Sequence, residues 1–184
     1  AAAEGAAVFL TAGDPMIATT HVDLRLRAAE RGIETEVVHG VTAQAAASSL
    51  TGLQNYRFGP STTLPFPSSH GAEGLPGSLV ETIDGNTERG LHTLVFLDIK
   101  AADDRYLRAS DGAALLAERY ADRLGVVVAR AGSDDPVVVA DRVEQLAEQS
   151  FGAPLHLLVL PGELHPMERD ALRTFADAPD AVRE

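Results

Sequence analysis

Short apolar runs alternate with amphipathic segments along most of the chain, and this alternation restricts the fold more than any other feature. Residues 7–11 form an apolar run that ends in the turn sequence Ala-Gly-Asp-Pro, which predicts a buried strand. Residues 21–31 mix apolar and charged side chains and stop at a glycine, which predicts a helix. A second strand is expected over 34–39 and an alanine-rich helix over 42–50. The order strand, helix, strand, helix is typical of a parallel α/β unit.

The second half of the chain repeats this alternation. The patterns predict helices over 78–89, 113–124, 141–149 and 165–176, and strands over 91–99, 125–130 and 155–160. Between the halves, prolines crowd together with serines and glycines, as in linkers and loops. We therefore predict two α/β domains: residues 1–58 as the remainder of an N-terminal domain, 59–77 as a linker and loop, and 78–184 as a C-terminal domain. The first half has too few strands for a covered sheet, so we expect the front of its domain to lie outside this chain.

Composition excludes several classes of site. The chain of 184 residues contains no cysteine, so disulfides and thiolate zinc sites are excluded. No apolar run is long enough to cross a bilayer. The first residues are apolar but lack a basic region and include Glu4, unlike a secretory signal, so we expect a cytoplasmic protein.

The charge balance is strongly acidic. The formal net charge is −12, and the fifteen basic residues include a single lysine, Lys100. Such a surface repels phosphate backbones and anionic lipids, so no nucleic-acid or membrane partner is expected. We hypothesise adaptation to high salt, where screening weakens the self-repulsion. The alternative is a merely acidic composition that prefers arginine to lysine.

Five histidines and one acidic pair are candidates for chemistry, but each also has a simpler interpretation. An isolated histidine near a strand end is more often a satisfied structural group than a general base; these residues are His21, His39, His92, His156 and His165. Their spacing fits no zinc pattern, so we predict no metal. Asp134 and Asp135 precede a proline and are interpreted as a solvated turn.

The first motif follows the strand expected over 7–11. It consists of Thr-Ala-Gly-Asp-Pro-Met at 11–16, followed by Ile-Ala-Thr-Thr-His at 17–21. Ligands of open α/β sheets bind at this end of a strand, although Gly-Asp-Pro alone is also an ordinary tight turn. With its continuation, the motif resembles the signature of the diphthine synthases, a family within the tetrapyrrole methylase superfamily.

Further blocks extend the resemblance across essentially the whole chain in the family's order. They are His-Gly-Val-Thr-Ala at 39–43, Thr-Gly-Leu-Gln-Asn-Tyr-Arg-Phe-Gly at 51–59, Glu-Arg-Gly-Leu-His-Thr-Leu-Val-Phe-Leu-Asp-Ile-Lys at 88–100, Ala-Arg-Ala-Gly-Ser at 129–133, Pro-Leu-His at 154–156 and Pro-Gly-Glu-Leu-His at 161–165. The family's glycine-rich turn after its first strand has no counterpart here. The segment 67–77 lacks the aromatic residues that members often carry.

The resemblance implies a tetrapyrrole methylase-like fold with S-adenosylmethionine in a cleft between two domains. Matching positions would hold the cofactor: Asp14, Ile17, Thr42, Ala43, Leu97, Ala131 and His156. Asp14 can accept hydrogen bonds, Ile17, Leu97 and Ala131 can form apolar walls, and Thr42 and Ala43 lie at a helix start that favours a carboxylate.

The resemblance also implies the reaction. The acceptor would be the amino group of the 3-carboxy-3-aminopropyl-histidine of translation elongation factor 2, in diphthamide biosynthesis, and family members pair as homodimers. Transfer of a sulfonium methyl group needs no metal and depends on orientation and exclusion of water. Two alternatives remain open: a methyltransferase acting on a corrin or porphyrin precursor, and a non-catalytic interaction module.

Overall fold

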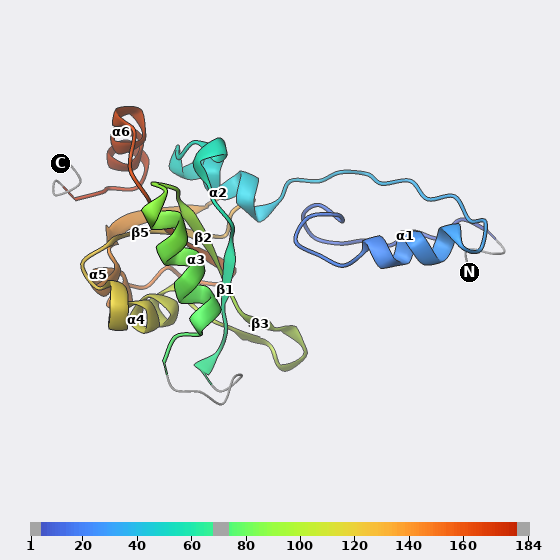
Figure 1. The fold of residues 1–184 in the computed structure, drawn as a ribbon, viewed down its shortest axis with the longest axis horizontal. Helices are drawn as coiled ribbons and strands as arrows, with labels where there is room; N and C mark the ends of the chain where they lie inside the picture. Colours follow the sequence, from blue (N-terminus) through green and yellow to red (C-terminus); the bar gives the residue numbers. More distant parts are fainter. Residues whose placement is uncertain (1–4, 68–73, 180–184) are drawn as a thin grey trace. The chain divides into compact units, whose positions relative to one another are not determined.

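The computed structural model describes residues 5–67 and 74–179 and divides the chain into two compact units (Figure 1). Unit 1 is Ala1–Ala46 and unit 2 is Ala47–Glu184. Helix α2 (Ala43–Thr51) crosses the boundary between them. Among the described residues, no helix combines the length and the apolar character that a membrane crossing requires.

Unit 1 contains one complete helix and two extended segments. The predicted helix is confirmed as α1 (Val22–Ala29), although none of its residues is buried. The strands predicted over 7–11 and 34–39 are wrong, because neither segment has strand hydrogen bonding in the described structure. Their apolar side chains are exposed, as at Val8, Leu10 and Val38. A strand is defined by a hydrogen-bonded neighbour, so an apolar run alone does not make one.

Unit 2 is built on a five-stranded sheet with the order β1-β2-β7-β5-β6. Only β1 and β2 are parallel, while the other three pairs are antiparallel. The strands are β1 (Thr62–Leu64), β2 (Thr93–Leu97), β5 (Leu124–Ala129), β6 (Val137–Arg142) and β7 (His156–Leu160). A two-stranded hairpin joins β3 (Ile99–Lys100) to β4 (Arg105–Tyr106) through a 3-10 turn, η3 (Ala101–Asp103).

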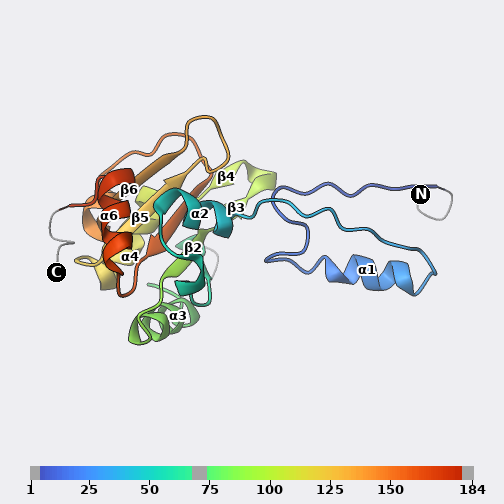
Figure 2. The same cartoon turned by 90° about the horizontal axis from the view of Figure 1, so that it is seen from above.

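Helices cover both faces of this sheet (Figure 2). One apolar cluster joins alternate strand residues such as Val95 and Val127 to helices α3, α4 and α5. The other joins the intervening residues, such as Leu94 and Val126, to α2 and α6. The helices are α3 (Gly77–Glu88), α4 (Ala109–Tyr120), α5 (Val143–Ala147) and α6 (Pro166–Phe175), with a 3-10 turn η1 (Asn55–Arg57) after α2. Burial on both faces explains why the central strands are continuous apolar runs.

The predicted helices and strands of unit 2 are confirmed, but two strands of the five-stranded sheet were missed. β1 lies inside the segment predicted as a linker, and β6 precedes the helix expected from residue 141. The α/β class is therefore correct, whereas the sheet is mixed rather than parallel.

A buried polar cluster fastens α6 to one end of the sheet. The Glu168 carboxylate accepts hydrogen bonds from the backbone N–H of Gln54 and of His165, each at 2.8 Å, and from His92 Nε2 at 3.0 Å. His92 Nδ1 accepts from Gly162 N–H at 3.0 Å, which fixes the proton on Nε2. Both side chains are completely buried, so their polar atoms depend on these partners.

Candidate active site

Asp14 connects two segments of unit 1. Its Oδ1 accepts a hydrogen bond from Met16 N–H at 2.8 Å. Its Oδ2 accepts from His39 Nδ1 at 2.7 Å and from Gly40 N–H at 3.3 Å. The Met16 backbone donor and His39 lower the pKa of Asp14, because both favour the ionised form. Asp14 is therefore an ionised carboxylate whose three donors leave one acceptor position, on a side chain that is 6% exposed.

Two glycines let these segments meet closely. Gly13 has a φ of +74°, a conformation that glycine adopts readily. A Cβ atom on Gly40 would collide with the carbonyl group of Gly13. A Cβ on Gly13 would lie 3.9 Å from the Cα of Thr42. The Asp14 turn and the start of α2 are thus neighbours.

Four of the predicted cofactor residues are brought together here. Thr42 precedes α2, and its Oγ1 accepts from Ala45 N–H at 3.1 Å, while Ala43 is the first helical residue. The other N–H groups of this first turn have no partner within the helix. Ile17 follows the Asp14 turn, and its side chain is 51% exposed. Unit 1 thus places a carboxylate, an apolar side chain and a helix start beside one another.

The remaining three predicted residues lie at one end of the unit 2 sheet. Phe96 pairs with Leu157, so Leu97 at the end of β2 and His156 at the start of β7 share that end. His156 also pairs with Ala129, and Ala131 follows two residues later. Antiparallel pairing therefore brings together residues from three separate sequence blocks.

The side chains at this end of the sheet are more deeply buried and more fully hydrogen-bonded than the sequence indicated. Leu97 is only 6% exposed, and it packs so tightly under α4 that a Cβ on Gly112 would lie 2.9 Å from its Cδ2. His156 Nδ1 accepts from Ala109 N–H at 3.0 Å, and its Nε2 donates to the Ala153 carbonyl at 2.9 Å. Burial lowers the pKa of His156, so the ring is neutral and has no free nitrogen.

The turn after β5 carries a feature that the sequence did not reveal. Arg130 has a φ of +52°, in the left-handed region that non-glycine residues seldom occupy. Its guanidinium donates to the Phe151 carbonyl at 2.8 Å and to the Asp135 carbonyl at 3.2 Å. These contacts hold the turn that presents Ala131. Nothing in an Ala-Arg-Ala sequence signals this backbone conformation.

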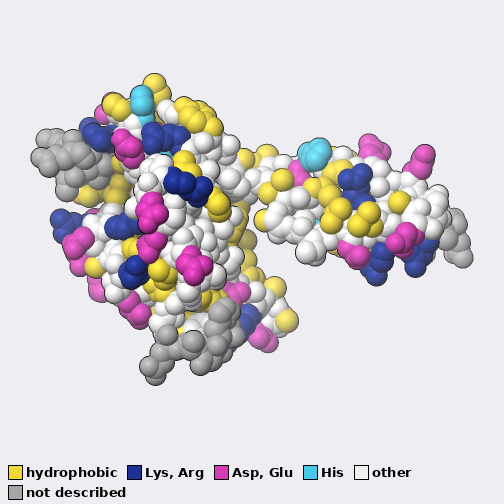
Figure 3. All heavy atoms as spheres, viewed as in Figure 1, with side chains coloured by type: hydrophobic (Ala, Val, Ile, Leu, Met, Phe, Trp, Pro, Cys, Tyr) yellow, Lys and Arg dark blue, Asp and Glu magenta, His cyan; other side chains and the backbone are white. Residues whose placement is uncertain are grey.

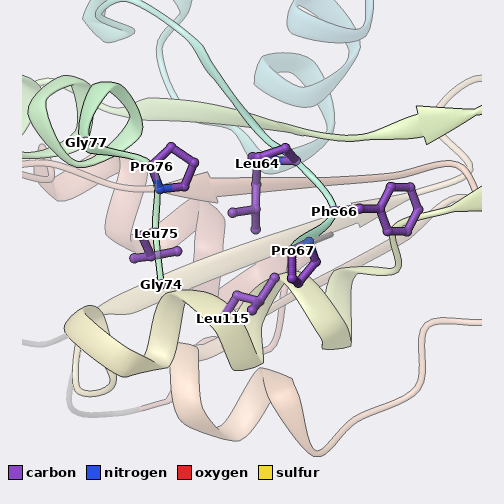
Figure 4. A pocket seen from close by; sticks show the side chains of 9 residues that line it. Leu64, Phe66, Pro67, Gly74, Leu75, Pro76, Gly77 and Leu115 are labelled. Atoms are coloured by element: carbon purple, nitrogen blue, oxygen red, sulfur yellow. The ribbon is translucent and has the colours of Figure 1, made fainter. Parts of the chain in front are cut away.

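A separate apolar cavity of about 280 Å³ opens in unit 2 between the end of β1, the start of α3 and α4 (Figure 4). It is lined by Leu64, Pro65, Phe66, Pro67, Gly74, Leu75, Pro76, Gly77 and Leu115. None of these side chains carries a polar group, so the described lining offers a ligand only apolar side chains and backbone groups. Beside it, Lys100 and Arg105 both lie over the Phe66 ring.

Comparison with known proteins identifies the class of the chain. Residues 1–147 match the family of tetrapyrrole (corrin/porphyrin) methylases. The chain therefore belongs to this methylase family, and its unit 2 has the α/β architecture described above.

The individual relatives are more specific. A diphthine synthase of Haloquadratum walsbyi is 68% identical over 93% of this chain and 66% of its own length. One of Halobacterium salinarum is 64% identical over 97% of this chain and 71% of its own length. Within its family, the chain thus belongs with the diphthine synthases, spanning about two thirds of their length.

Solved structures of diphthine synthases are similar to this chain in fold. The crystal structure of a diphthine synthase has a TM-score of 0.82 and 38% identity, with 92% of this chain and 65% of that chain covered. A putative diphthine synthase from Entamoeba histolytica has a TM-score of 0.80 and 32% identity, with 91% and 69% covered.

Proposed function

We propose that this chain is the part of a diphthine synthase that holds S-adenosylmethionine and methylates the amino group of the 3-carboxy-3-aminopropyl-histidine of translation elongation factor 2. The observation that carries this proposal is the close similarity to diphthine synthases over nearly the whole chain. The clustering of the predicted cofactor residues within each unit is consistent with it.

The residues of unit 1 fit the chemical groups of the cofactor. The ionised Asp14 can accept hydrogen bonds from an amine or from ribose hydroxyls. The N–H groups at the start of α2 favour a carboxylate. The exposed Ile17 offers apolar surface to an adenine ring. When bound, the cofactor supplies an electrophilic methyl group, and the chain contributes orientation and exclusion of water.

We extend the proposal to the architecture and the assembly. The cofactor would lie in a cleft between two α/β domains, to which Leu97, Ala131 and His156 contribute from the second domain. Because the two side chains Leu97 and His156 are buried, we assign their contribution to the backbone at the strand ends. We propose the domain division at 1–58, 59–77 and 78–184 for the whole enzyme, with β1 of the middle segment paired to the sheet of the second domain. A homodimer and a cytoplasmic location are parts of the same proposal.

The first experiment measures, by calorimetry at high KCl concentration, how tightly the chain binds S-adenosylmethionine. Replacement of Asp14 by asparagine would turn the charge-assisted hydrogen bond proposed to the cofactor into a neutral one. We therefore expect the dissociation constant to rise about tenfold. Asp23→Asn, on the exposed face of α1, is the matched control and should leave affinity unchanged. Undetectable binding by the wild-type chain would favour the interaction module.

The second experiment tests the acceptor. Methyl transfer is measured to elongation factor 2 that carries the aminocarboxypropyl group, to the unmodified factor, and to a porphyrinogen. We expect transfer to the first alone. Activity confined to the porphyrinogen would support the tetrapyrrole alternative instead. Sedimentation of the same sample reports whether the chain is a dimer.

A further inference from the structure

His39 has the geometry of a base oriented by a carboxylate. Its Nδ1 lies 2.7 Å from Asp14 Oδ2, and its side chain is 73% exposed. An ionised carboxylate can only accept a hydrogen bond, so the proton of a neutral His39 ring is on Nδ1. The lone pair then lies on Nε2, the ring nitrogen that is farther from Asp14. This is the arrangement in which a carboxylate fixes the tautomer of a histidine base.

Other described histidines lack this combination. His92 and His156 are buried, and both nitrogens of each ring are bonded within the fold. His165 Nδ1 accepts from Met167 N–H at the start of α6. His21 Nδ1 bonds the Pro15 carbonyl at 2.9 Å, a neutral partner in place of a carboxylate. Among the described residues, His39 alone joins an exposed ring to a carboxylate partner.

The position of His39 adds a second argument. It precedes Gly40, whose close contact with Gly13 joins the Asp14 turn to the segment that leads into α2. These are the elements of unit 1 to which the proposed function assigns the cofactor. A base at this point is therefore carried by the same junction as the groups that would hold the methyl donor.

The proposed reaction needs such a base. An aliphatic amine is mostly protonated near neutral pH, and an ammonium group has no lone pair with which to attack a methyl group. Resting on the proposed function, we infer that His39 is the general base that deprotonates the substrate amine. Nε2 takes one proton from the ammonium group. The freed lone pair then forms the nitrogen–carbon bond as the carbon–sulfur bond breaks and its electron pair returns to sulfur. His39 releases the proton to solvent.

Replacing His39 by asparagine tests its catalytic role apart from its structural role. Its amide N–H₂ can replace Nδ1 as the donor to Asp14, but it has nothing in place of Nε2. General-base catalysis typically contributes a factor of about 10² to 10⁴. We expect both His39→Asn and His39→Ala to lower kcat by at least about a hundredfold. The cofactor affinity of His39→Asn, measured by calorimetry, should stay within about twofold of wild type. Asp23→Asn, on the exposed face of α1, is the control and should retain wild-type turnover.

The pH profile provides a readout that a structural role would not change. The defect of His39→Asn should narrow at alkaline pH, because there the substrate amine loses its proton unaided. Near-wild-type turnover of His39→Asn at neutral pH would overturn the inference and leave Asp14–His39 as a structural pair. If the wild-type chain itself transferred no methyl group, the proposed function would fail instead.

A measurement without turnover tests the geometry directly. Nitrogen NMR of the imidazole rings distinguishes the two neutral tautomers in the wild-type chain. We expect the Nδ1–H form at His39 and a change in its population in Asp14→Asn. An Nε2–H tautomer at His39 would overturn the inference whatever the activity, because that nitrogen would have no lone pair to offer.

Discussion

At the scale of single residues, Glu168 ties three separate segments of unit 2 together. It is completely buried and accepts from Gln54, His92 and His165. Glu168→Ala would leave these donors unsatisfied in the core, so we expect a loss of about 3 to 5 kcal/mol in the free energy of unfolding. Urea denaturation measures this loss in the free energy of unfolding. Asp170→Ala, an exposed residue of the same helix, should change stability by less than about 0.5 kcal/mol; equal losses would contradict the assignment.

The buried histidines make stability depend on pH. Burial lowers the pKa of His92 and of His156 in the folded chain, whereas the unfolded chain keeps a value of about 6.5. Below that pH the unfolded state binds more protons, so stability is fully present above about pH 6.5 and decreases as the pH falls. Burial opposes a lowered pKa at Glu168, but the backbone N–H groups of Gln54 and His165 and the His92 ring outweigh it, so the loss continues below about pH 4.3.

The check is the urea midpoint at several pH values and constant high ionic strength. We expect the midpoint to stay nearly level from pH 7.5 to about pH 6.5 and to fall from there to pH 5. His156→Gln removes one titrating group and should flatten this dependence. A midpoint that stayed level over that range would show that neither ring is held neutral by the fold.

At the scale of secondary-structure elements, two helical glycines allow a matched comparison. Gly85 in α3 has open space where a Cβ would lie, whereas a Cβ on Gly112 in α4 would press on Leu97, Leu158 and Leu64 at 2.9, 3.2 and 3.4 Å. We expect Gly85→Ala to stabilise by about 0.5 to 1 kcal/mol, because alanine restricts the unfolded chain. Gly112→Ala should destabilise by about 1 kcal/mol, since overpacking exceeds that gain. Thermal unfolding compares them, and equal shifts would contradict the tight packing of α4.

Helices and strands were predictable from the sequence where local signals, such as apolar spacing, determine them. The helices of unit 2 follow apolar spacing, and α3 ends just before Gly90. β1 was missed because prolines 60, 65 and 67 surround it, and its state depends on pairing with β2. The segment 7–11 was wrongly predicted as a strand for the converse reason, since apolar character does not provide a partner.

In the candidate site, too, local motifs were informative, whereas contacts between distant segments were not predictable. Family motifs indicated which residues cluster, and the clustering within each unit follows from strand ends and from glycine contacts. The Asp14–His39 bond and the burial of Leu97 were not predictable, because both depend on segments that are distant in sequence. Arg130 needed the structure as well, since its backbone conformation is set by contacts with Phe151 and Asp135.

At the scale of the whole molecule, charge is the dominant property. The net charge is −12, carboxylates are spread over the visible surface (Figure 3), and similar relatives come from halophilic archaea. Raising salt from 0.1 M to 1 M shortens the screening length from about 10 Å to about 3 Å. We therefore expect the thermal midpoint to rise over this range.

A charge variant serves as the control for this salt dependence. Glu118, Asp134 and Glu148 are exposed and take part in no ion pair within the described structure. Replacing all three by their amides should reduce the slope of the midpoint against salt. An unchanged slope would assign the effect to the ions' action on apolar surface rather than to screening.

The position of the Glu168 cluster has a consequence for evolution. It lies where β2 begins and β7 ends, whereas Leu97 and His156 mark the opposite ends of these two strands. The buried polar cluster and the proposed cofactor residues of unit 2 therefore lie at opposite ends of one sheet. Selection on stability can therefore act on residues around α6 while the proposed cofactor residues at the other end of the sheet stay unchanged.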